Sequence, residues 1–277
     1  MTIDAIIEIV AETAPEIRDG LVDRRGTTDE QNPSDEIQLE ADVWADERLE
    51  DRLTALDGVG AYASEERKGI VEAGDGYSVT LDPLDGSSNL KSNNSMGTIL
   101  GIYDGQLPAA GRDLVASAYV LYGPITTMMV ARDDTVTEYV IEDDGSRRPV
   151  TTDLTLPADP VVYGFGGGVP DWTDEFSTFA SEIQRELKLR YGGAFIGDVN
   201  QVLTYGGVFA YPELETAPEG KLRLQFEGIP VGHIVATAGG RASTGTGSLL
   251  EVDPTELHQR TPVYVGNTDL IERRERV

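Results

Sequence analysis

The segment V-T-L-D-P-L-D-G-S-S-N-L, residues 79–90, constrains the fold of this chain more than any other feature of its sequence. Apolar residues at alternate positions over 77–81 predict a strand. We expect this strand to end at Asp82, because Pro83 fixes φ and has no N–H for a ladder hydrogen bond. A tight turn then places Asp82 and Asp85 on the same side. Two carboxylates so close repel each other at neutral pH unless a positive group lies between them.

The residues after the second aspartate are suited to binding an anion. Gly86 permits a positive φ or a close backbone approach, and Ser87 and Ser88 are good N-cap residues for a helical turn. The N–H groups of such a turn would point at whatever the carboxylates hold. This arrangement is typical of a hard divalent cation that bridges carboxylates to a phosphate. From this segment alone, an acidic surface turn is an equally good interpretation.

A second acidic pair favours the metal site. Glu65 and Glu66 lie shortly before the predicted strand, so a neighbouring element could bring them to Asp82 and Asp85. Four converging carboxylates would need at least two cations. That is the arrangement of two-metal phosphoryl hydrolysis, in which one cation activates water and the other stabilises the leaving oxygen.

Helical and strand patterns are mixed in both halves of the chain. Apolar residues at helical spacing predict helices over 3–22 and 39–56, with a polar, mobile loop at 24–36 between them. Alternation and turn signals predict the other elements, which are strands at 96–103, 115–122, 125–131, 136–141, 207–211, 222–226 and 263–265, and helices near 172–188 and 229–238. The pattern changes near 150, so we expect α/β layers in two subdomains, 1–150 and 151–277.

The charge of the chain limits its partners and its setting. The 277 residues include 49 acidic and 22 basic side chains, for a net charge of -27, and no cysteine. Disulfides and thiolate sites are excluded, and a nucleic acid would be repelled. The acids are spread along the chain rather than gathered in a tail, which indicates adaptation to a salty cytoplasm. With no long apolar run and an acidic N-terminus, we expect a soluble cytoplasmic protein with no membrane partner.

Further motifs follow in order through nearly the whole chain. Besides S-E-E and L-D-P-L-D-G-S-S-N they are G-T-I-L-G-I-Y (97–103), G-R-D-L-V-A-S-A-Y-V-L-Y-G (111–123), Y-G-G-V-F-A-Y-P (205–212), G-K-L-R-L-Q-F-E (220–227), A-G-G-R-A-S-T-G (238–245) and H-Q-R-T-P-V (258–263). Together they resemble the metal-dependent, lithium-sensitive sugar and inositol phosphatases, and most closely the class I fructose-1,6-bisphosphatases. Glu227 stands where the inositol branch has a Trp-Asp motif. The resemblance implies a fold of alternating helix and sheet layers, an α-β-α-β-α sandwich of the sugar phosphatase type.

The resemblance also implies a role for individual residues. Those on metal-ligand positions are Glu65, Asp82, Asp85, Glu227 and the carbonyl of Leu84, which hold two or three Mg²⁺ ions, with Mn²⁺ or Zn²⁺ as substitutes. Most of these lie in the N-terminal subdomain. Asp42 and Glu66 match the pair that orients and deprotonates the attacking water, and Asp35 or Glu36 the acid of a mobile loop. Gly86, Ser87 and Ser88 would hold the phosphate that is cleaved.

The second, retained phosphate is assigned to the C-terminal half. The matching residues are Arg190, Tyr191, Tyr211 and Lys221. A bisphosphate entering so acidic a protein needs such a local basic pocket. In the family the arginine comes from a neighbouring subunit, which implies a dimer or a tetramer. The two histidines, His233 and His258, are interpreted as structural.

The expected activity is hydrolysis of the 1-phosphate of fructose 1,6-bisphosphate in gluconeogenesis. The segment L-R-Y-G-G-A-F-I-G-D-V-N-Q, residues 189–201, resembles the sedoheptulose-bisphosphatase branch at least as well. A sedoheptulose-1,7-bisphosphatase or a dual-specificity enzyme is therefore the first alternative. A non-catalytic sugar-phosphate-binding regulator is the second, and the intact set of acids speaks against it.

Overall fold

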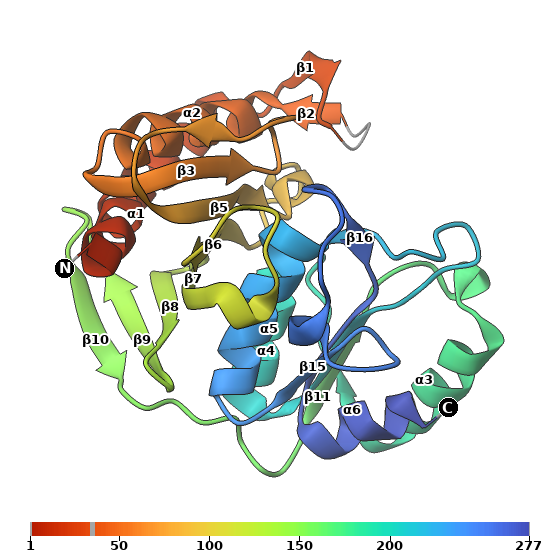
Figure 1. The fold of residues 1–277 in the computed structure, drawn as a ribbon. Helices are drawn as coiled ribbons and strands as arrows, with labels where there is room; N and C mark the ends of the chain where they lie inside the picture. The colour runs from red at the N-terminus through yellow and green to blue at the C-terminus, as the bar shows by residue number, and fades with distance from the viewer. Residues whose placement is uncertain (1, 34–36, 277) are drawn as a thin grey trace.

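The computed structural model describes residues 2–33 and 37–276, and five layers of helix and sheet succeed one another in it (Figure 1). The larger sheet has eight strands in the order β10-β9-β8-β7-β6-β5-β3-β4. Its strands are β3 (Gly58–Ser64), β4 (Val71–Glu72), β5 (Gly76–Asp85), β6 (Met96–Tyr103), β7 (Leu114–Tyr122), β8 (Thr126–Arg132), β9 (Thr135–Ile141) and β10 (Arg147–Thr151). All neighbours are antiparallel except β3 and β5, which are parallel.

Two helices cover the outer face of this sheet. They are α1 (Thr2–Gly20) and α2 (Glu40–Leu53). In α1 the apolar side chains of Ile6, Ile7, Val10 and Ile17 recur at helical spacing, and they are buried in a core shared with α2 and the sheet. Before α2, β1 (Thr27–Gln31) and β2 (Ile37–Leu39) pair as a small antiparallel ribbon, so the prediction of a loop over 24–36 is wrong in part.

The second sheet has five strands in the order β12-β11-β13-β17-β15. They are β11 (Val162–Phe165), β12 (Lys188–Leu189), β13 (Gly207–Tyr211), β15 (Arg241–Ser243) and β17 (Val263–Gly266). Two helices, α4 (Phe195–Tyr205) and α5 (Ile229–Thr237), lie between the two sheets and share a second core with both. On the far face, α3 (Asp174–Glu186) and α6 (Thr268–Glu275) enclose a third core that is rich in aromatic rings. The expected α-β-α-β-α sandwich is confirmed.

Two strand predictions near the site are wrong in detail. β5 continues past Pro83 to Asp85, because a register shift between Asp82 and Asp85 places the proline where no ladder N–H is needed. The strand expected over 222–226 is only the two-residue β14 (Leu222–Arg223), which pairs with β16 (Arg260–Thr261) and leads into a π-helical turn. Within the described residues, no helix is both long and apolar enough to span a membrane.

Candidate active site

The parallel pairing of β3 with β5 places the acids of two segments side by side. Ser64 lies opposite Leu81, and the N–H of Glu65 donates to the carbonyl of Leu81 at 3.0 Å. Both strands leave the sheet at the same edge because they run in the same direction. Glu65 therefore comes next to Asp82, and both residues are buried.

The irregularity in β5 aims two aspartates into the same space. Asp82 pairs with Ile99 and Asp85 with Gly97 across β6, with the extra residues bulging between them. The Oδ1 atom of Asp82 accepts the N–H of Leu84 at 2.9 Å, which closes the bulge. Thus the Asp-Pro-Leu-Asp segment is a bulged strand that turns both carboxylates to one side.

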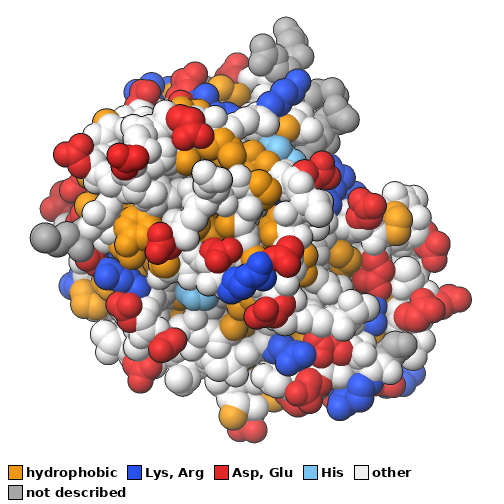
Figure 2. Space-filling model, in the orientation of Figure 1, with side chains coloured by type: hydrophobic (Ala, Val, Ile, Leu, Met, Phe, Trp, Pro, Cys, Tyr) orange, Lys and Arg blue, Asp and Glu red, His pale blue; other side chains and the backbone are white. Residues whose placement is uncertain are grey.

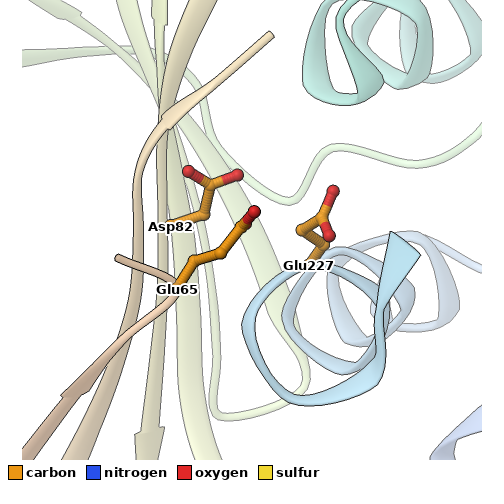
Figure 3. A group of neighbouring side chains, drawn as sticks. All are labelled: Glu65, Asp82 and Glu227. Atoms are coloured by element: carbon orange, nitrogen blue, oxygen red, sulfur yellow. The ribbon is translucent and has the colours of Figure 1, made fainter. Parts of the chain in front are cut away.

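The third acid comes from the other half of the chain. Glu227 lies in the π-helical turn η5 (Leu224–Gly228), and its Oε2 accepts the N–H of Arg223 at 2.6 Å. One carboxylate oxygen from each of Glu65, Asp82 and Glu227 lies within 4.8 Å of the others (Figure 3). π-Helical turns are rare and occur often at functional sites. The structure thus brings together acids that are separated by more than half the sequence.

Asp85 is anchored by the helix between the sheets. Its two oxygens accept the N–H groups of Phe195 at 3.3 Å and Ile196 at 2.8 Å, both in the first turn of α4. The first-turn N–H groups of a helix have no partner inside the helix, so a carboxylate is a natural acceptor there. The sequence analysis did not predict α4, and this anchor was missed with it.

Four of these acids have raised pKa values. Burial raises the pKa of Asp85 to about 7, although the N–H of Ile196 opposes the shift, and burial with repulsion from Asp42 and Glu65 raises the pKa of Glu66 to about 8. Burial and repulsion between the acids also raise the pKa of Asp82 and of Glu227 well above their ordinary values. Clustered carboxylate oxygens with unmet negative charge are the donors that hard divalent cations prefer. The donor set fits a divalent metal.

These acids line one cavity of about 250 Å³ together with the glycine-serine turn. The predicted site residues on its wall are Asp42, Glu65, Glu66, Asp82, Leu84, Asp85, Gly86, Ser87, Ser88 and Glu227. Gly86 has φ +74°, which favours glycine, and a Cβ there would lie 2.3 Å from the Cβ of Ala194. Backbone conformation and space therefore both require glycine at this position. Gly86 leads into a 3₁₀ turn, Ser87–Leu90. The backbone N–H groups at the start of this turn are suited to bind an anion.

Asp42 and Glu66 form the wall on the side of α2. Asp42 is in the first turn of that helix, and its Oδ2 accepts the N–H of Leu39 at 2.8 Å. The side-chain amide of Gln38 donates to Glu66, and the N–H of Glu66 donates to Oγ of Ser64 at 3.2 Å. Both carboxylates are therefore oriented by neighbours. Because they lie on the wall of the same cavity, Asp42 and Glu66 repel each other.

Three residues of this cavity were missed by the sequence analysis. They are Asn32, Gln38 and Arg223. Arg223 is ion-paired with Glu65. It is the arginine of the motif G-K-L-R-L-Q-F-E, four residues before Glu227, and this position in the motif could have indicated it. Nothing in the sequence near Gln38 or Asn32 would have singled them out. Asp35 and Glu36 lie outside the described residues.

The residues predicted for the retained phosphate are absent from the described wall of this cavity. Burial raises the pKa of Tyr191 to about 12, with added repulsion from Tyr211, Asp198 and Asp85. The guanidinium of Arg190 lies 5.7 Å over the ring of Tyr205. Lys221 is exposed. All four residues therefore lie outside the described wall of the acidic cavity.

Two family models match the chain, and together they span almost all of it. The fructose-1,6-bisphosphatase N-terminal domain matches residues 1–147, and the fructose-1,6-bisphosphatase C-terminal domain matches 156–277. The chain belongs to the fructose-1,6-bisphosphatase family. Members of the family are metal-dependent phosphoric monoester hydrolases that act on a sugar bisphosphate in gluconeogenesis.

Individual fructose-1,6-bisphosphatases agree in sequence and in fold. A class 1 fructose-1,6-bisphosphatase of Natronomonas pharaonis is 63% identical over 99% of this chain and 97% of its own length. One of Halobacterium salinarum is 60% identical over 97% of this chain and 94% of its own. The crystal structure of Leishmania major fructose-1,6-bisphosphatase in holo form superposes with a TM-score of 0.90 at 28% identity, covering all of this chain and 93% of that one.

Proposed function

We propose that the protein hydrolyses the 1-phosphate of fructose 1,6-bisphosphate with Mg²⁺, releasing fructose 6-phosphate and inorganic phosphate. This proposal rests on one observation: clustered acids and a glycine-serine turn suited to a phosphate line the same cavity. Membership of the fructose-1,6-bisphosphatase family supplies the substrate.

Five groups would hold the metal ions, two or three per site. They are the side chains of Glu65, Asp82, Asp85 and Glu227 and the carbonyl of Leu84. When bound, the cations polarise the phosphoryl group and lower the pKa of water, and Mn²⁺ or Zn²⁺ could replace Mg²⁺. In the proposed division of the chain, 1–150 contributes most of these groups, and 151–277 contributes Glu227 and the sugar-phosphate residues.

The chain's own residues perform the other steps. Asp42 and Glu66 orient the attacking water and remove its proton, because a carboxylate of raised pKa is a suitable base near neutral pH. The N–H groups and hydroxyls of the turn Gly86, Ser87 and Ser88 hold the phosphate in line. Water then replaces the sugar oxygen on phosphorus, without a phospho-enzyme intermediate.

The retained phosphate would be held by Tyr191, Tyr211 and Lys221 together with Arg190 of a neighbouring subunit. Arg190 directly follows the edge strand β12, and its neighbours Leu189 and Tyr191 are 59% and 47% exposed. Large apolar side chains exposed on a sheet edge are suited to contact with another subunit. We therefore propose a homo-oligomer, a dimer or a homotetramer, in which this edge is covered.

The working environment would be a cytoplasm of high salt, where a substrate of sugar metabolism is available. Figure 2 shows acidic side chains spread over the visible face, with a smaller number of basic ones among them. At about 1 M salt the screening length is only about 3 Å, which mutes repulsion among such charges.

Phosphate release from a panel of sugar phosphates tests the proposal. The panel contains fructose 1,6-bisphosphate, sedoheptulose 1,7-bisphosphate, fructose 6-phosphate and inositol 1-phosphate, each with and without Mg²⁺ at low and multimolar KCl. We expect the highest kcat/KM for fructose 1,6-bisphosphate. Preference for the seven-carbon sugar would instead support the sedoheptulose-bisphosphatase alternative, and no release from any ester would support a non-catalytic regulator.

A further inference from the structure

Arg67 lies directly after the acidic pair Glu65–Glu66 and contacts the helix that faces them. Its Nε atom pairs with the buried Asp46, and its Nη2 atom pairs with Glu50. Asp46 and Glu50 follow Asp42 at intervals of four residues, so the three acids form one row along α2. Arg67 therefore binds two members of this row, while the third faces Glu66 in the active-site cavity.

The pairing with Asp46 is reinforced from the strand that carries the acids. The hydroxyl of Tyr62, in the middle of β3, donates to Oδ1 of Asp46 at 2.7 Å, and Tyr62 is fully buried. Asp46 thus accepts one bond from within β3 and one from the turn that follows it. A forked guanidinium suits this geometry because it donates to two carboxylates in one plane.

The backbone of Arg67 extends the connection to the C-terminal half. Its carbonyl oxygen lies 2.8 Å from Nε2 of His258, and a carbonyl only accepts, so the histidine donates. The ring of His258 packs against Phe226 with centroids 5.0 Å apart, and Phe226 precedes Glu227 in the π-helical turn. Arg67 therefore contacts α2 directly and is connected to the segment that carries Glu227 through the ring of His258.

The charge of this region explains why such a connection is needed. The guanidinium of Arg67 neutralises part of the negative charge that the row on α2 and the Glu65–Glu66 pair place close together, and Arg223 pairs with Glu65. Like charges at such separations repel, and without Arg67 the helix and the turn would move apart. The spacing of carboxylates decides whether they can share a small cation, since Mg²⁺ requires near-ideal geometry.

We propose that Arg67 is a positioning residue for the metal site, acting through Asp46 and His258. It sets the separation of α2 from the Glu65–Glu66 turn and ties that turn to the one that carries Glu227. This inference rests on the proposed function for its consequence in catalysis, but its consequence for metal binding does not require turnover.

The test compares the metal affinity of matched variants. Mn²⁺ binding is measured by calorimetry, and the Mg²⁺ dependence of phosphate release gives kcat and KM. We expect Arg67→Met to lose about tenfold in Mn²⁺ affinity and to need about tenfold more Mg²⁺, with little change in KM for the bisphosphate. Arg67→Lys should recover part of the loss, because an ammonium can pair with one of the two acids.

A double variant separates positioning from folding. Arg67→Met alone leaves the buried Asp46 without its cation and could unfold the protein. In Arg67→Met/Asp46→Asn that charge is gone, while the amide oxygen can still accept the Tyr62 hydroxyl, so we expect thermal stability to recover but metal affinity to stay low. Wild-type Mn²⁺ affinity in the folded double variant would overturn the proposal.

The histidine contact and a control complete the design. His258→Phe keeps the ring packing but removes the donor, and we expect weaker Mn²⁺ binding that His258→Gln restores. Arg52→Met breaks a more exposed pair between α2 and Glu16 of α1, whose residues are not on the cavity wall, and should bind Mn²⁺ like the wild type. Equal losses in Arg52→Met and Arg67→Met would overturn the proposal. If the wild type binds Mn²⁺ but releases no phosphate, the proposed function fails while this comparison still decides.

Discussion

Arg223 and Glu65 form an ion pair inside the acidic cavity: Nη2 of Arg223 lies 3.1 Å from Oε1 of Glu65, and their side chains are only 5% and 10% exposed. The pair joins β14 of the C-terminal half to the end of β3. A buried guanidinium beside a cluster of acids partly replaces the charge that a metal would supply. The stability of the metal-free protein should therefore depend on Arg223.

Arg223→Met is expected to lower the free energy of unfolding of the metal-free protein by about 3 kcal/mol, because it leaves Glu65 buried without its partner. Saturating Mg²⁺ should restore more stability to this variant than to the wild type. Urea unfolding in EDTA and in Mg²⁺ measures both quantities, and an identical gain from Mg²⁺ in the two proteins would contradict the prediction.

Asp85→Asn is expected to lower kcat by about a thousandfold or more, since it removes one negative charge from the proposed metal ligands. The asparagine oxygen can still accept an N–H from the first turn of α4, so the far-ultraviolet circular dichroism should be unchanged. Near-wild-type turnover of fructose 1,6-bisphosphate would refute the assigned role. Asp143→Asn, an exposed change elsewhere, is the control.

The metal-free protein is expected to lose stability as the pH rises from about 4 to about 8. The pKa of Asp85 in the folded protein is about 7, against an ordinary value of 3.8, and that of Glu66 is about 8, against 4.5. The folded state therefore binds more protons than the unfolded state in this window, and its stability falls as those protons leave. Saturating Mg²⁺ should reverse the trend, because metal binding displaces protons. Thermal unfolding at pH 5, 6, 7 and 8, with Mg²⁺ or EDTA, measures the slope; a stability that rises with pH in EDTA would be the opposite result.

Potassium chloride is expected to raise the melting temperature by about 10 °C or more between 0.1 and 3 M, as several kcal/mol of repulsion are screened. The net charge of -27 and the dispersed acids in Figure 2 are the reason. Sucrose at matched water activity controls for solute exclusion, which stabilises without screening. If sucrose and KCl raise the midpoint equally, screening is not the cause.

Gly86→Ala is expected to lower the free energy of unfolding by about 3 kcal/mol and to impair phosphate release. The added Cβ would meet Ala194, and the φ of +74° is unfavourable for alanine. Gly86→Ala/Ala194→Gly removes the contact with the Cβ of Ala194 but keeps the one with its Cα at 2.9 Å and the backbone strain, so it should regain only part of the stability. Full recovery in the double variant would show that the left-handed conformation is unimportant.

Apolar periodicity predicts a helix or strand correctly when one face of the element is buried and the other faces solvent. α1 and α2 are of this kind, whereas β6 is buried at every position and is predicted by the turn signal Tyr103-Asp104-Gly105 that ends it. The alternation of Leu222, Leu224 and Phe226 predicts a strand where the structure has a π-helical turn. The residues between them, Arg223 and Gln225, are buried as well. A segment enclosed on all sides carries no periodic signal.

The acidic half of the site was predictable because its residues lie in short, contiguous motifs. The second phosphate subsite stays a prediction, because Arg190 and Lys221 are assigned by resemblance alone and lie outside the described wall of the acidic cavity. The structure of a single chain does not test a residue that is proposed to act in a neighbouring subunit. The network of Arg67, Asp46 and His258 depends on contacts between distant segments, and no spacing in the sequence reveals them.

The parallel pair β3 and β5 stands alone in a sheet that is otherwise antiparallel, and it has a topological consequence. In a simple hairpin the exit of the first strand would adjoin the entrance of the second, and Glu65 would sit about 20 Å away from Asp82, a whole strand length. The chain instead doubles back between the two strands before entering β5. That detour through β4 brings the ends of two separate strands to one acidic cavity.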